Sequence, residues 1–161
     1  YQSTHDTVTG LYNRAFFDDY LNRQISSGDY PISLVMIDVD GLKQVNDRYG
    51  HPVGDELLRR VSFVLRSIVR SADSVARIGG DEFALLLPGA DESTAQAVMN
   101  RLEEQLAAVN QTKLGHPIDL SFGTATAANP EEMETLVQAA DHAMYQQKLA
   151  KRARKSGQPI S

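Results

Sequence analysis

The feature that most constrains the fold is a pair of short apolar runs separated by a glycine-rich turn. The runs cover residues 74–78 and 83–87, and the turn between them reads Gly79-Gly80-Asp81-Glu82. Two such runs joined by a tight turn predict a β-hairpin, whose strands are antiparallel. The chain therefore does not fold into a wholly parallel sheet. The tip of the predicted hairpin carries two carboxylates.

A further apolar run precedes the hairpin at residues 32–39. It is short and lacks polar alternation, which predicts a strand buried on both faces. Its last part carries Asp38, and Asp40 follows directly. A helix with apolar residues along one face, which we expect to begin at Gly54-Asp55, joins this strand to the hairpin.

Three more helices and one more strand complete the prediction. We expect helices over residues 15–25 and 92–109, the second capped by Asp91, and a last helix whose first turn contains Pro130. Residues 118–122 alternate between apolar and polar side chains, as a half-buried strand does. This order of elements predicts an α+β fold with a central, mostly antiparallel sheet covered by helices.

The composition excludes several classes of protein. The 161 residues contain no cysteine, so a disulfide framework, a thiolate zinc site and a cysteine nucleophile are ruled out. No Gly-x-Ser-x-Gly motif is present, which argues against a serine hydrolase, and the four histidines lack metal-ligand spacing. The apolar stretches are too short to span a bilayer, so we expect no direct membrane contact. The length of the chain fits one domain over residues 1–161.

Charge is distributed unevenly along the chain. The net charge is −5, but residues 148–155 contain five cations and no acid, which leaves 11 cations against 21 acidic residues elsewhere. An acidic body does not suit general nucleic-acid binding, so we expect no nucleic-acid partner. The basic end is either a cationic clamp facing an acidic metal site or a solvated helix terminus favoured by the helix dipole. Charge counting alone favours the second interpretation.

Two acidic centres lie at the ends of predicted strands. Asp38-Val39-Asp40 ends the buried strand, and Asp81-Glu82 forms the hairpin tip. If the two strands are neighbours, these carboxylates meet at one edge of the sheet, where hard oxygen ligands suit Mg²⁺. Taken singly, each acid is better explained as a turn or cap residue.

The backbone beside both acidic centres is suited to contact a ligand. Gly79 and Gly80 supply either the positive φ of a tight turn or space for a ligand to approach the main chain. After the buried strand, the backbone N–H groups of Gly41 and Leu42, with the ammonium of Lys43, can hold a phosphate tail.

Two polar side chains are suited to a guanine base. Asp55 either caps its helix or accepts hydrogen bonds from the two adjacent N–H donors of guanine. Asn46 carries both a donor and an acceptor, so it can read the same base from another side.

The hairpin turn carries the sequence Arg77-Ile78-Gly79-Gly80-Asp81-Glu82-Phe83. On these residues the chain resembles the GGDEF domains, which are diguanylate cyclases. Further blocks follow the family's order along nearly the whole chain: His5-Asp6, Thr9-Gly10-Leu11, Asn13-Arg14, residues 38–43, Asn46-Asp47, Gly50-His51, Gly54-Asp55-Glu56 and residues 141–148. Several blocks in the right order are far more specific than the turn alone.

The resemblance implies a fold like the palm of nucleotidyl cyclases and polymerases, with five strands in the central sheet. It implies that two GTP condense into cyclic di-GMP, with release of two pyrophosphates, on a homodimer in which each domain holds one GTP. The implied metal ligands are Asp38, the Val39 carbonyl and Asp81, which hold two Mg²⁺ per active site or Mn²⁺ in their place. Asp81 and Glu82 are the implied catalytic residues, Asp81 chiefly as a metal ligand and Glu82 as its support.

The resemblance also assigns the substrate contacts. Asn46 and Asp55 match the guanine readers, and Gly79 and Gly80 border the nucleotide. The implied triphosphate contacts are the backbone at Gly41 and Leu42 and the side chains of Lys43, Lys148 and Arg152. Lys151 stands where the family often has glycine, which affects the placement of Arg152, and we interpret Lys151, Arg154 and Lys155 as solvated.

A second site is implied for the product. Arg70 and Asp73 form an Arg-x-x-Asp motif at the position of the family's inhibitory site, and Arg101 matches a further arginine that binds cyclic di-GMP there. The motif alone is common and is usually an ion pair at a helix end. Its position before the hairpin favours product inhibition.

The resemblance implies a sensory domain elsewhere in a parent protein, so we expect Tyr1 to begin a fragment. It also implies a cytoplasmic domain, even where the parent is anchored in a membrane. Two other functions stay open. A non-catalytic sensor of GTP or cyclic di-GMP is disfavoured because the turn keeps its glycines and carboxylates, and an enzyme joining GTP to ATP is disfavoured because Asp55 selects guanine.

Overall fold

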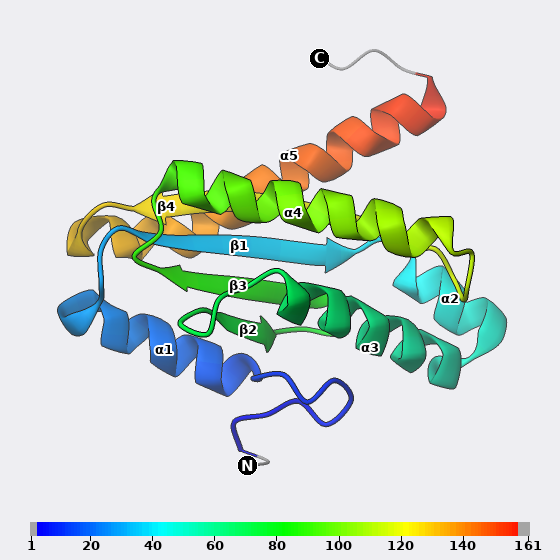
Figure 1. Cartoon of the computed structure of the whole chain (residues 1–161), viewed down its shortest axis with the longest axis horizontal. Helices are drawn as coiled ribbons and strands as arrows, with labels where there is room; N and C mark the ends of the chain where they lie inside the picture. Colours follow the sequence, from blue (N-terminus) through cyan, green and yellow to red (C-terminus); the bar gives the residue numbers. More distant parts are fainter. Residues whose placement is uncertain (1–2, 158–161) are drawn as a thin grey trace.

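The computed structural model describes residues 3–157; Tyr1, the expected start of a fragment, lies outside them. A central sheet is covered by helices on both faces (Figure 1). In chain order the elements are α1 (Arg14–Ser27), β1 (Ile32–Val39), α2 (Leu42–Tyr49), α3 (His51–Ser67), β2 (Ser74–Arg77), β3 (Glu82–Pro88), α4 (Glu92–Gln111), β4 (Leu120–Ala127), the 3₁₀ helix η1 (Pro130–Thr135) and α5 (Leu136–Ser156). Within the described residues, no helix is both long and apolar enough to cross a membrane.

The strands run in the order β2-β3-β1-β4, and every neighbouring pair is antiparallel. The α+β fold, the hairpin and the antiparallel sheet are therefore confirmed. In the register, Asp38 at the end of β1 lies opposite Glu82 at the start of β3 and opposite Ser121 in β4. This register brings the two acidic centres to one edge of the sheet.

The prediction of five strands is wrong, because the sheet of the described residues has four. At the outer side of β2, one residue of the described chain pairs with the strand. The Tyr12 N–H donates to the Val75 carbonyl at 3.3 Å, and the Arg77 N–H donates to the Tyr12 carbonyl at 2.8 Å. Asn13 follows directly and caps α1 by accepting a hydrogen bond from the Phe16 N–H at 3.0 Å. The early start of α1 thus leaves no residues to extend this bridge into a fifth strand.

Strand β1 is buried along its whole length, as its apolar sequence predicts. Alternate residues point to opposite faces of a strand, so β1 contributes to two separate apolar cores. Val35, Ile37 and Val39 pack with α3 and α4, whereas Ile32, Leu34 and Met36 pack with α1, η1 and α5. A fully buried central strand fixes the position of the carboxylates at its end.

Helix α5 packs very closely against β4 at Gly123. A Cβ atom on this glycine would lie 2.1 Å from the Met144 backbone nitrogen and 2.6 Å from the Ala140 carbonyl oxygen. Next to it, the Phe122 N–H donates to the Gln147 Oε1 at 2.7 Å. Glycine at this position therefore allows the backbone of α5 to approach the sheet.

Several helix boundaries differ from those predicted. The last helix is divided into η1 and α5, and the segment after Gly41 forms a separate helix, α2, that the sequence analysis did not predict. Helix α3 begins at His51 rather than at Gly54-Asp55. Its N-cap is Gly50, whose φ of 92° separates α2 from α3. Asp55 therefore lies inside the helix, and its interpretation as a cap is wrong.

Candidate active site

The acidic edge of the sheet is built around Asp38. Its side chain is 8% exposed, and its Oδ1 is buried without a hydrogen-bond partner in the described part of the chain. Burial raises the pKa of Asp38, and the neighbouring Asp81 carboxylate raises it further, while the hydrogen bond from Lys148 lowers it. A buried carboxylate with an orphaned oxygen is a favourable place for a cation.

The hairpin turn lies against the end of β1. The Val39 N–H donates to the Asp81 carbonyl at 2.8 Å, so the backbone ties the two acidic centres together. Burial raises the pKa of Glu82, and the negative charges of Asp141, Asp81 and Asp38 raise it further. The structure thus places the predicted metal ligands and catalytic carboxylates together.

This group of oxygens fits a divalent cation that keeps part of its hydration shell. Among residues 3–157, no three acidic or histidine side chains gather closely enough to form a metal site by themselves. Mg²⁺ commonly takes only one or two protein carboxylates and completes its shell with water and substrate phosphates. Asp38, Asp81 and the Val39 carbonyl are the groups that would hold it.

The turn glycines do not have the conformation expected of them. Neither Gly79 nor Gly80 has a positive φ, so the interpretation based on a left-handed turn is wrong. Apart from its two chain neighbours, no described residue lies within 4 Å of the position a Cβ would take at Gly80, whereas one at Gly79 would contact Glu82 at 3.4 Å. Open space at Gly80 is compatible with the other interpretation, in which a ligand approaches the backbone.

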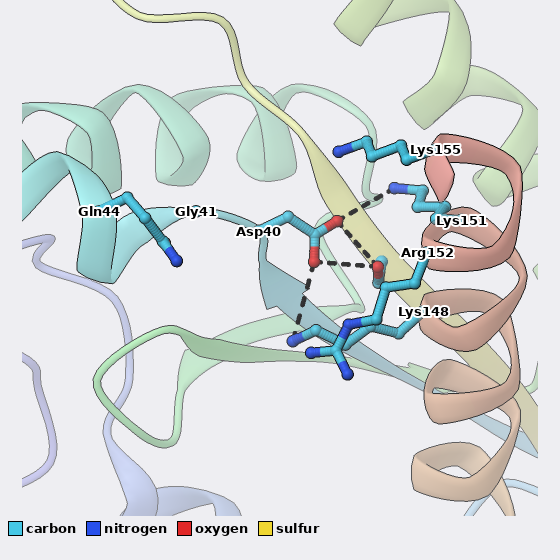
Figure 2. Close-up of a pocket in the computed structure, with 8 residues that line it drawn as sticks. Asp40, Gly41, Gln44, Lys148, Lys151, Arg152 and Lys155 are labelled. Carbon is cyan, nitrogen blue, oxygen red and sulfur yellow. Dashed lines mark hydrogen bonds and ion pairs between the residues drawn. The ribbon is translucent and has the colours of Figure 1, made fainter. Parts of the chain in front are cut away.

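A cationic pocket of about 310 Å³ adjoins the acidic edge (Figure 2). Its lining residues come from α2, β4, α5 and the end of β1: Asp40, Gly41, Gln44, Ser121, Lys148, Lys151, Arg152 and Lys155. Lys148 contacts the Asp38 carboxylate, and its Nζ lies 3.8 Å from Asp40 Oδ1. Arg152 has no ion-pair partner in the described part of the chain, so its guanidinium is free to receive an anion.

Two of the three cations interpreted as solvated are paired. Lys151 is 22% exposed and contacts Asp40 at 3.2 Å and Asp119 at 2.9 Å. Lys155 reaches Asp119 at 3.5 Å but stays largely exposed. Burial raises the pKa of Asp119, but Lys151 and Lys155 outweigh it and lower the pKa below its usual value. The interpretation of Lys151 as solvated is therefore wrong, because two acids outside α5, Asp40 and Asp119, pair with it.

Gln44 and Ser121 were not predicted as site residues. Gln44 lies in the first turn of α2, which the sequence analysis did not recognise as a helix. Ser121 lies in β4 and donates to the Asp40 carboxylate at 2.8 Å, a contact across 81 positions that no local pattern indicates.

The predicted guanine readers lie on neighbouring helices. Asn46 is in α2 and Asp55 in α3, and these helices meet at Gly54, where a Cβ would lie 1.7 Å from Asn46 Oδ1. Asn46 Oδ1 is buried and has no hydrogen-bond partner in the described residues. The phosphate segment precedes them: Gly41, with φ of 80°, is the N-cap of α2, and Lys43 is exposed in its first turn.

The predicted inhibitory residues lie at the other end of the sheet. The Arg70 guanidinium donates to Asp73 at 2.9 Å and to the Pro88 carbonyl, at the end of β3, at 2.9 Å. Arg101 of α4 donates to the Ile68 carbonyl at 3.0 Å. Ile68 is the C-cap of α3, so Arg101 lies beside the end of the helix that precedes Arg70. Because Glu82 begins β3 and Pro88 ends it, about 20 Å of strand separate this group from the acidic edge.

Together, these features define an α+β domain in which carboxylates at one edge of an antiparallel sheet adjoin a cationic pocket. The family described as "Diguanylate cyclase, GGDEF domain" matches residues 3–154. The chain belongs to this family.

Curated and solved relatives agree with this assignment. Diguanylate cyclase DosC of Escherichia coli strain K12 is 39% identical over 155 residues, which cover 91% of this chain and 33% of that protein. Diguanylate cyclase SiaD of Pseudomonas aeruginosa, solved with its activator SiaC, superposes with a TM-score of 0.82 at 31% identity, over 92% of this chain and 59% of that one. The coiled coil and GGDEF domain of DgcB from Caulobacter crescentus, solved with cyclic di-GMP, superposes with a TM-score of 0.78 at 29% identity. The match covers 98% of this chain and 83% of that one. The chain spans about a third of the length of DosC.

Proposed function

We propose that this chain is a catalytic domain that condenses two GTP into cyclic di-GMP and releases two pyrophosphates. The observation that carries the proposal is the juxtaposition at one sheet edge of buried Asp38, the turn that holds Asp81, and the pocket lined by Lys148 and Arg152. Carboxylates for a metal and cations for a triphosphate are thus adjacent. Family membership supports the choice of reaction.

Each residue of the site has a role in this reaction. Asn46 and Asp55 hold the guanine, and the amides at the start of α2 hold the triphosphate together with Lys43, Lys148 and Arg152. When bound to Asp38, Asp81 and the Val39 carbonyl, two Mg²⁺, or Mn²⁺ in their place, lower the pKa of the attacking 3′-hydroxyl and neutralise charge on the reacting oxygens. Glu82 supports this carboxylate group, and the open backbone at Gly80 leaves room for the nucleotide.

Turnover requires two copies of the domain. One pocket holds one GTP, so each 3′-hydroxyl has to meet the α-phosphate of a GTP bound to a second copy, with the two nucleotides antiparallel. We propose that a longer cytoplasmic or membrane-anchored parent, in which a sensory domain controls this encounter, carries the chain. The length of DosC, of which the chain matches 33%, supports such a parent.

The test is product formation by an enforced dimer of this chain. With GTP and Mg²⁺ we expect cyclic di-GMP by mass analysis, and none from the matched Asp81→Asn dimer. GTP, ATP and their mixture are compared in parallel, because Asp55 predicts a product made from GTP alone. If the wild-type dimer binds GTP tightly but forms no cyclic dinucleotide, the proposed catalytic function is wrong and a role as a nucleotide sensor takes its place.

Product inhibition is a second part of the proposal. It is supported by the position of Arg70, Asp73 and Arg101 at one end of the sheet, where two arginines and a carboxylate can meet the phosphates and guanines of cyclic di-GMP. The test is whether cyclic di-GMP binds this surface and slows the enforced dimer.

A further inference from the structure

Lys151 joins three elements at the sheet edge. Its Nζ lies 3.2 Å from an Asp40 oxygen and 2.9 Å from an Asp119 oxygen, and it also donates to the Leu120 carbonyl. These partners belong to the segment after β1 and to the start of β4, whereas Lys151 belongs to α5. Figure 2 shows Lys151 and Lys148 reaching the Asp40 carboxylate from α5. Lys151 therefore ties α5 to the end of the sheet.

The C-terminal half of α5 depends on such polar contacts. The buried residues of α5 are Leu136, Ala140 and Met144, so burial of apolar side chains ends one turn before Lys148. Beyond that point, within the described residues, the hydrogen bonds and ion pairs of α5 with the sheet and its flanking segments come from Gln147, Lys148, Lys151 and Lys155. Lys148 and Arg152 project from this polar half, one turn apart, and Lys151 lies between them.

The pairing of Asp40 explains why a second lysine is needed. Lys148 contacts Asp38 and lies near Asp40, so it has to leave both carboxylates before it can bind a phosphate. Asp40 is only 16% exposed, and a carboxylate left unpaired there would be costly. Lys151 and Ser121 keep Asp40 paired when Lys148 moves.

We propose that Lys151 is a positioning residue for the triphosphate, an inference that rests on the proposed function. It holds Asp40 and Asp119, fixes the end of α5, and so allows Lys148 to exchange its carboxylates for phosphate while Arg152 faces the pocket. The competing role is that of a direct phosphate ligand, in which Lys151 itself leaves the two acids.

The two roles predict opposite effects of Asp119→Asn. For a positioning residue, Asp119→Asn and Lys151→Met both weaken GTP binding, because both break the same contact. We expect about tenfold weaker binding for Lys151→Met, about threefold for Asp119→Asn, and a double variant no weaker than Lys151→Met alone, since the residues act as one unit. For a direct ligand, Asp119→Asn would release the lysine and strengthen binding, an outcome that would overturn the proposal.

Calorimetry with GTP and Mg²⁺ measures binding, and steady-state kinetics of the enforced dimer separates KM from kcat. We expect KM to rise and kcat to stay within about twofold in Lys151→Met, because triphosphate binding is lost equally from ground state and transition state. Lys151→Arg should restore part of the affinity. Arg154→Met is the matched control, because Arg154 lies in the same helical turn and forms no ion pair with the described residues, so its removal should leave affinity unchanged.

Hydrogen exchange gives a readout that needs no nucleotide. In Lys151→Met the amides of residues 149–156 should lose protection relative to Arg154→Met. Absence of cyclic di-GMP from the wild-type dimer would refute the proposed function, whereas unchanged GTP affinity and unchanged exchange in Lys151→Met would refute the positioning role.

Discussion

Replacing Gly123 with alanine should loosen the attachment of α5 to the sheet. The added Cβ would lie 2.1 Å from the Met144 nitrogen, 2.5 Å from the Ala143 carbonyl carbon and 2.6 Å from the Ala140 oxygen, against 3.4–4 Å for ordinary contact. All three atoms belong to backbone, which cannot rotate away as a side chain can. Helix α5 therefore has to move outward by about 1 Å or more to restore ordinary contact distances, and such backbone shifts destabilise a packed core.

The magnitude follows from two opposing effects. Overpacking a core costs about 1–3 kcal/mol, whereas replacing glycine by alanine within a strand recovers about 0.5–1 kcal/mol of backbone entropy. The contacts at Gly123 are severe, so we expect a net loss of about 2 kcal/mol in the free energy of unfolding. For a domain of this size that loss lowers Tm by roughly 4–8 °C.

Urea and thermal unfolding of Gly123→Ala, followed by circular dichroism, measure this loss. Gly80→Ala is the matched control, because its Cβ would meet no described residue within 4 Å beyond its chain neighbours and its φ is not positive. Its stability should stay within about 0.5 kcal/mol of wild type. Gly123→Ala should also bind GTP about tenfold more weakly, because α5 carries Lys148 and Arg152 and small misplacements of binding groups are costly. A Gly123→Ala protein as stable as the control would refute the reasoning that the backbone of α5 rests on this glycine.

Three further predictions concern other parts of the structure. Burial raises the pKa of Asp6, but hydrogen bonds from Thr9 and the charge of Arg77 outweigh burial, so the net effect lowers the pKa. The ionised carboxylate therefore stabilises the fold above its unfolded pKa of about 3.9, and this stabilisation is lost in acid. Asp6→Asn should thus be less stable than wild type at pH 7 and equally stable near pH 2 by urea unfolding; a difference that persists in acid would contradict this cause. Burial raises the pKa of Glu82, and the charges of Asp141, Asp81 and Asp38 raise it further. Ionisation of Glu82 therefore destabilises the fold as pH rises above about 4.3. In the absence of divalent metal, Glu82→Gln should gain stability relative to wild type from about pH 4 to pH 7. A gain already complete at pH 3 would point to packing instead of charge. Arg70→Ala should bind cyclic di-GMP at least tenfold more weakly by calorimetry, with the initial rate of the enforced dimer unchanged, and equal affinity in this variant would remove Arg70 from the inhibitory site.

The sequence predicted β1, β2 and β3 to within one residue at each end, whereas β4 covers Leu120–Ala127 instead of the predicted residues 118–122. Strand β1 has the predicted bounds, because a run of eight residues in which only Ser33 and Asp38 are polar fits best in the middle of a covered sheet. Helix α2 was missed because its eight residues offer only Leu42 and Val45 to the core, too few to produce a helical pattern. The start of α3 was placed too late because the helix was recognised by its periodic apolar residues. Its first turn begins instead with His51 and Pro52, and a proline at this position favours a helix start without adding to that periodic pattern.

The candidate site was predictable where the chain repeats a family motif. Asp38, the hairpin turn and Lys148 were recognised in this way, and the register of β1 with β3 places them together. The role of Lys151 was not predictable, because its partners Asp40 and Asp119 lie 111 and 32 positions away and no local pattern distinguishes a paired lysine from a solvated one.

The contact between Arg70 and the Pro88 carbonyl has a consequence for how a product could inhibit the enzyme. Strand β3 connects this arginine to Glu82, but it is held by β1 on one side and β2 on the other and is buried along its middle five residues. Bending a strand so confined would disturb the close packing on both of its faces, which is costly. We therefore expect cyclic di-GMP bound at Arg70 to leave the shape of the nucleotide pocket unchanged. Its effect would instead be to restrict the movement of the whole domain, and so to decide whether the domain can meet a second copy.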